Sequence, residues 1–174
     1  MRKIPKREEV IFNSCKSKDG GSLAFDLKVI DAKMDSSSIH FSFKSELPVP
    51  PHPDLIDRLQ LLKPRLVEAF GWILFTKLQS NKDFSASAAQ KKYLKGALET
   101  IEDNIRVTGV QYIGKDNTGA IVKGTYDGYP INCKIYFTNQ DWGEDMEKLV
   151  SEIADETYEY VYNDKYQQLE AFDD

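Results

Sequence analysis

The sequence is poor in the residues that build most metal sites and thiol sites. It has only two cysteines and two histidines among 174 residues. Cys15 and Cys133 lie 118 positions apart with no histidine near either, which fits neither a disulfide framework nor a zinc-ligand spacing. His40 and His52 are separated by a proline-rich segment and have no cysteine near them. The sequence therefore predicts two reduced thiols, no metal and no cofactor.

Long apolar runs are also missing. The longest candidate, "FGWILF" at residues 70–75, is far shorter than the roughly 20 residues that span a bilayer. The first residues, "MRKIPKREEV", are basic but lead into no apolar region of the kind that a signal peptide has. We expect a protein of the cytoplasm without a membrane partner.

No catalytic motif stands out. The segment "YIGKDNTG" has glycines and a lysine but not the order of a phosphate-binding P-loop. Adjacent carboxylates such as Glu102 and Asp103 would point to different sides of a helix, which suits shared acid and base chemistry poorly. We predict no catalytic residue and a protein that is not an enzyme.

What is present favours an α+β fold. Apolar residues alternate with polar ones over residues 23–34 and 39–46, which predicts two N-terminal strands. Three further strands, over 105–114, 119–127 and 131–139, are separated by turn residues and predict an antiparallel meander.

Helical spacing marks the segments between and after these strands. A helix is predicted from Asp54, with Leu55, Leu59, Leu62 and Leu66 on one face and a kink or break at Pro64. A second is predicted over 88–104. The last begins at the D-x-x-E pattern of Asp141 and Glu144 and runs for about 20 residues. We expect it to cover one face of a mostly antiparallel sheet.

Composition divides the chain into three parts. Residues 1–20 are polar and charged and end in "KDGG", which predicts a flexible charged arm. Residues 21–163 hold the predicted elements and are expected to form a single α+β domain. Residues 164–174 lie beyond the helical pattern and form an acidic tail.

Charge is distributed unevenly along the chain. Residues 1–138 hold 21 of the 23 Lys and Arg and 16 of the 28 Asp and Glu, a balance of +5. Residues 139–174 hold 2 basic and 12 acidic residues, a balance of −10. A basic body is thus followed by an acidic end, which the net charge of −5 conceals.

Aromatic and basic residues alternate in the predicted strands, as they do in proteins that stack bases of single-stranded nucleic acid inside a basic groove. Such rings also fill cores and cross-strand pairs, and both readings stay open here. The candidate nucleic-acid-binding residues are Phe41, Phe43, Lys44, Tyr112, Lys115, Lys123, Tyr126, Lys134 and Tyr136.

The acidic end offers a candidate protein contact. Its residues are Leu169, Glu170, Phe172, Asp173 and Asp174, two apolar side chains among carboxylates at the end of the chain. The acidic face of the last helix itself can also be explained as the solvated side of an amphipathic helix. Deleting the tail should leave folding intact and weaken a partner contact if the tail is functional.

Four segments give the chain a resemblance to a loose family of small uncharacterised proteins of tailed bacteriophages and prophages. They are "PPHPDLIDRLQLLKPRL", "VTGVQYIGKDNTGAIVKGT", "INCKIYF" and "WGEDMEKLVSEIADETYEYVYNDKYQQLEAF". This resemblance implies a place among early or replication and recombination genes and the cytoplasm of a bacterial host. It implies no catalytic residue.

Three functions follow as hypotheses. The first is a non-enzymatic phage or mobile-element protein that assists DNA replication or recombination by binding single-stranded DNA, its acidic end engaging a replication protein. The second is a protein-interaction module that inhibits a host enzyme or defence system through its acidic C-terminal surface. The third is a small virion or assembly component.

Overall fold

A computed structural model of the chain describes residues 4–18, 22–30, 40–47, 50–79, 96, 99–113 and 117–163. Within these ranges, the side chains of residues 40–47 and 72–79 are outside the description.

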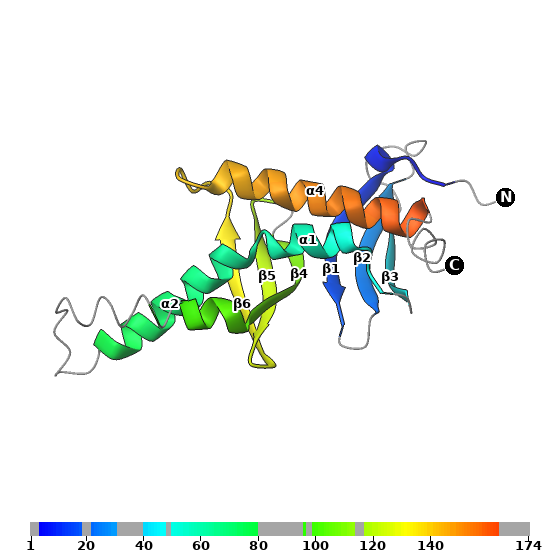
Figure 1. Ribbon diagram of the computed structural model, residues 1–174. Helices are drawn as coiled ribbons and strands as arrows, with labels where there is room; N and C mark the ends of the chain where they lie inside the picture. The colour runs from blue at the N-terminus through cyan, green and yellow to red at the C-terminus, as the bar shows by residue number, and fades with distance from the viewer. Residues whose placement is uncertain are drawn as a thin grey trace.

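A six-stranded antiparallel sheet forms one layer of the fold (Figure 1). Its order is β3-β2-β1-β4-β5-β6. The strands are β1 Val10–Ser17, β2 Leu23–Ile30, β3 His40–Leu47, β4 Ile105–Ile113, β5 Gly119–Tyr126 and β6 Tyr129–Tyr136. The predicted N-terminal strand pair and three-strand meander are confirmed as β2–β3 and β4–β5–β6.

The sheet consists of two meanders joined at a short seam. Strands β1 and β4 pair through three residue pairs only, Ser14 with Gln111, Cys15 with Val110 and Lys16 with Gly109. The pairings inside each meander are longer, with seven pairs between β1 and β2 and eight between β4 and β5. The seam is therefore the shortest pairing in the sheet.

The prediction of a flexible arm over residues 1–20 is wrong for most of this segment. A 3₁₀ turn, η1, covers Arg7–Glu9, and β1 lies in the middle of the sheet. Val10, Phe12 and Cys15 on β1 are buried at 4%, 3% and 1% exposure. The register shifts between Phe12 and Ser14. A bulge of this kind breaks the two-residue alternation, which hides the strand in the sequence.

The helices lie on one face of the sheet (Figure 1). They are α1 Pro53–Gln60, α2 Lys63–Gln79 and α4 Gly143–Tyr162, and residues 96 and 99–104 are helical as well. The helix that was predicted from Asp54 is interrupted between α1 and α2, just before Pro64, as predicted. Pro64 then sits in the first turn of α2, where its missing N–H costs no helical hydrogen bond. The predicted long C-terminal helix over one sheet face is confirmed.

The core lies between the sheet and these helices. The four predicted leucines, Leu55, Leu59, Leu62 and Leu66, are fully buried, and so are Val150 and Ile153 of α4. Tyr160 is buried too, and its hydroxyl donates to the carbonyl of Pro50 at the entry to α1. Helix α4 thus fixes the start of α1 as well as one face of the sheet.

The start of α4 differs in detail from the prediction. The D-x-x-E pattern places a capping side chain at Asp141, yet Trp142 occupies the N-cap position and makes no capping hydrogen bond. Instead Asn139 Oδ1 accepts from the backbone N–H groups of Asp141 and Trp142, at 2.9 and 3.3 Å. In the described part of the chain, no helix has the length and apolar character to cross a membrane.

Candidate nucleic-acid interface

The face of the sheet opposite the helices, which we call the open face, carries charged side chains that are mainly basic. Side chains alternate between the two faces along a strand, so the neighbours of the buried core positions point to this side. The described basic residues on it are Lys16, Lys28, Arg106, Lys123 and Lys134, with Lys18 directly after β1. Among the described side chains of the strands, Asp26 is the acidic one.

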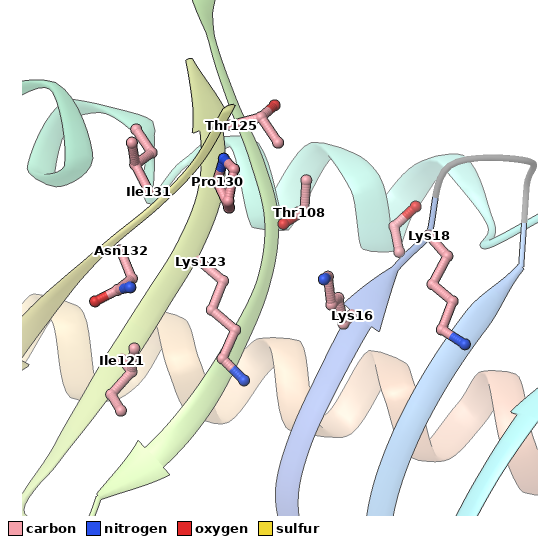
Figure 2. A pocket seen from close by; sticks show the side chains of 11 residues that line it. Lys16, Lys18, Thr108, Ile121, Lys123, Thr125, Pro130, Ile131 and Asn132 are labelled. Atoms are coloured by element: carbon pink, nitrogen blue, oxygen red, sulfur yellow. The ribbon is translucent and has the colours of Figure 1, made fainter. Parts of the chain in front are cut away.

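A hollow of about 570 Å³ lies on the open face (Figure 2). Strands β1, β4, β5 and β6 contribute its lining, which includes Lys16, Lys18 and Lys123 together with Thr108, Thr125 and Asn132. Figure 2 shows the three lysines on the side of the strands away from the helices. No carboxylate is among the residues that line the hollow. The hollow is therefore a concentration of positive charge beside hydroxyl and amide groups.

Lys123 is held in place within this hollow. Its Nζ donates to Gln111 Oε1 at 2.8 Å, and Gln111 lies on the neighbouring strand β4. Ammonium groups that lie close together repel one another, and such clusters attract anions. The lysine N–H groups of this hollow can donate hydrogen bonds to phosphate oxygens.

The open face includes three of the predicted nucleic-acid-binding residues. Lys123 lines the hollow, and Lys134 and Tyr136 follow on β6, both exposed. Tyr136 is 51% exposed. These residues come from two adjacent strands and point to the same side.

Two of the predicted tyrosines point the other way. Tyr112 packs edge-on against Phe12 and Phe137, and Tyr126 packs against Phe70 of α2. Burial raises the pKa of Tyr112, and Glu147 on α4 adds to this effect. Both rings are partly buried on the helix-covered face, so they lie apart from the basic residues of the open face.

The side chains of the remaining predicted binding residues lie outside the described part of the structure. The backbone of Phe41 pairs with Val29, that of Phe43 with Leu27 and that of Lys44 with Asp26, but these three side chains lie outside the described ones. Lys115 and the tail residues Leu169, Glu170, Phe172, Asp173 and Asp174 lie outside the described residues altogether.

Two lysines of the hollow were missed by sequence reasoning. Lys16 and Lys18 belong to the segment that was predicted to be an arm. The alternation of Val10 and Phe12, resumed at Cys15 after one extra residue, is the signal that would have revealed a strand here. Two-residue alternation that allows one bulged residue places Lys16 on the face opposite the core.

Acidic side chains gather on α4, on the opposite side of the molecule, and several of them form ion pairs. Arg58 of α1 contacts Glu152 at 2.7 Å and Glu156 at 3.4 Å. Arg7 contacts Asp155 at 2.6 Å. These pairs connect η1 and α1 to α4, so three of the seven acidic residues of the helix have a structural role. Glu144, Asp145 and Glu147 remain exposed near the helix start, where the dipole favours them.

The two thiols lie away from the open face and are poor nucleophiles. Burial raises the pKa of Cys15 to about 11, an effect that a hydrogen bond to Thr157 only partly opposes. Burial also raises the pKa of Cys133 to about 11. In the described part of the chain, no three His, Cys, Asp or Glu side chains are grouped so that they could hold a metal.

These pKa values predict slow alkylation. Since only the thiolate reacts and an ordinary thiol has a pKa of about 8.5, both cysteines should react with iodoacetamide at about pH 8 on the order of 100-fold more slowly than in denaturant. Mass spectrometry of the folded and the urea-unfolded protein measures both rates. Fast labelling of either cysteine in the folded protein would contradict the buried placement of Cys15 or the partly buried placement of Cys133.

Comparison with protein-family models, with curated proteins and with solved structures finds no match to this chain. The resemblance to bacteriophage proteins therefore stays a prediction that rests on its motifs.

Proposed function

We propose that this protein binds single-stranded nucleic acid along the open face of its sheet and acts as a non-enzymatic accessory in DNA replication or recombination. The observation that carries the proposal is the separation of charge between the two faces. Basic side chains lie on the open face around a hollow free of carboxylates, while the acids of α4 lie across the molecule and partly in ion pairs. Such a face attracts the phosphate backbone.

The shape of the face favours a single strand over a duplex. Six strands at about 4.8 Å spacing make a surface about 24 Å wide, whereas the major groove of a DNA duplex is about 12 Å wide and admits a helix or a two-stranded ribbon. A duplex could meet this face only through its outer phosphates. A single strand can lie flat on it and offer both phosphates and bases.

The alternative of an acidic contact surface has less support. The exposed carboxylates of α4 that form no ion pair described above are Glu144, Asp145 and Glu147 near its start and Glu159 in its last turn. The first three form a small cluster where acids stabilise the helix itself, and Glu159 accepts a hydrogen bond from the side chain of Asn163. The acidic tail, which would enlarge this surface, lies outside the described residues.

Fluorescence anisotropy with a labelled oligothymidine of about 20 nucleotides tests the proposal. We expect binding at about 50 mM salt, with the logarithm of the association constant falling against the logarithm of the salt concentration at a slope of about −3. This slope corresponds to four lysine–phosphate contacts at about 0.7 each. The matching duplex should bind more weakly. Absence of binding to the single strand at low salt would overturn the proposal.

A further inference from the structure

The positions of the lysines define a direction across the sheet. Gly109 of β4 pairs with Lys16 of β1 on one side and with Lys123 of β5 on the other. Lys123 pairs in turn with Asn132 of β6. These four residues form one row that runs perpendicular to the strands. At about 4.8 Å between strands, the two lysine Cα atoms of the row lie about 10 Å apart.

Within this row no side chain stands between the two lysines, because the residue between them is glycine. A Cβ atom at Gly109 would lie 2.3 Å from the carbonyl oxygen of Cys15, so the close approach of β1 requires glycine here. An anion can therefore reach both ammonium groups at once, with the hydroxyls of Thr108 and Thr125 close by.

The basic surface continues past the hollow along the edge strand β6. Lys134 follows Asn132 on the same face of β6, and Tyr136 follows Lys134. Tyr136 pairs with Gly119, so its cross-strand neighbour has no side chain to cover the ring, which is 51% exposed. From strand geometry, the Tyr136 Cα lies about 14 Å from that of Lys123. A compact anion in the hollow would not reach this ring, whereas a polymer would.

We infer that a single strand crosses the sheet from β1 toward β6, with a phosphate group anchored between Lys16 and Lys123 and a base stacked on Tyr136. This inference rests on the proposed function and adds to it the path of the strand and the role of each residue. The two lysines supply salt-dependent affinity. Tyr136 supplies affinity that depends on the bases and not on salt.

Two matched pairs of variants separate these roles. Lys16→Gln combined with Lys123→Gln should make the salt slope about 1.4 smaller in magnitude and lower the affinity at about 50 mM salt on the order of 50-fold. Lys148→Gln removes an exposed lysine of α4 on the opposite side and should change neither quantity. Circular dichroism spectra establish that each variant folds.

The second pair tests stacking. Tyr136→Ala should weaken binding of oligothymidine about tenfold without changing the salt slope. It should leave binding of an abasic oligonucleotide of the same length unchanged. Tyr129→Ala removes a more exposed ring, at 75%, from a position that pairs with the inward-facing Tyr126. This control should bind as the unaltered protein does.

The outcomes distinguish the path from the function. If the protein binds the single strand but the lysine pair keeps its full salt slope, or Tyr129→Ala weakens binding as much as Tyr136→Ala, the path is overturned and the proposed function stands. If inorganic tripolyphosphate binds as tightly as the oligonucleotide and displaces it, the hollow is a site for a compact anion and the path is overturned as well. If no single strand binds, the proposed function and the path both fail.

Discussion

A chain that lacks residues 1–18 is expected not to fold. The deletion removes β1, which connects the two meanders through its pairs with β2 and β4. It also removes three buried core side chains, Val10, Phe12 and Cys15, each worth on the order of 1 to 3 kcal/mol of burial. A domain of ordinary stability has about 5 to 15 kcal/mol in total. Circular dichroism and urea denaturation should show no cooperative transition.

A shorter deletion is the control for this experiment. A chain that begins at Ile4 keeps the hydrogen bond from the Tyr158 hydroxyl to the Pro5 carbonyl, at 2.7 Å, and the Arg7–Asp155 ion pair. It should unfold at the same urea concentration as the full chain. A cooperative transition in the chain without residues 1–18 would show that this segment is the dispensable arm that its composition suggests.

Replacing Gly109 with alanine is expected to lower the free energy of unfolding by about 2 to 3 kcal/mol, the upper range for overpacked sites. The added Cβ would lie 2.3 Å from the Cys15 carbonyl oxygen and 2.9 Å from the Lys16 Cα. Both contacts are with backbone, so side-chain rotation cannot relieve them. The β1–β4 seam has only three residue pairs, so a local displacement affects a large part of it. Urea denaturation measures the change.

Gly96 supplies the matched control. It is an exposed helical glycine, and a Cβ built on it meets no atom within 4 Å beyond its chain neighbours and the backbone of its own helix. Gly96→Ala should raise the free energy of unfolding by about 0.5 to 1 kcal/mol, because alanine favours the helix. If Gly109→Ala were as stable as the unaltered chain, β1 and β4 would not approach as closely as described.

The fold could be predicted where the apolar period is regular. The leucine spacing from Leu55 to Leu66 and the apolar stripe of α4 each bury one face, and the structure has them buried. Pro64 predicted the break between α1 and α2, because a proline inside a helix removes one backbone hydrogen bond. By contrast, the bulge in β1 shifts the alternation of buried and exposed residues by one position. For this reason the central strand β1 was not predicted from the sequence.

The candidate interface was harder to predict, because it depends on which strands become neighbours. Lys123, Lys134 and Tyr136 lie on predicted strands, but the sequence does not say which face the helices cover. Tyr112 and Tyr126 were grouped with them for their residue type and lie on the opposite face. The row from Lys16 to Lys123 forms only because β1 and β4 pair across 93 positions of sequence at Lys16 and Gly109.

Lysine acetylation footprinting with oligothymidine present and absent tests the central claim most directly, because it reports which face the strand covers in the unaltered protein. We expect Lys16, Lys123 and Lys134 to be protected by the oligonucleotide, with protection lost at high salt. Lys148 on α4 should be acetylated at the same rate in both samples. Protection of Lys148 with unchanged labelling of the three open-face lysines would contradict the account.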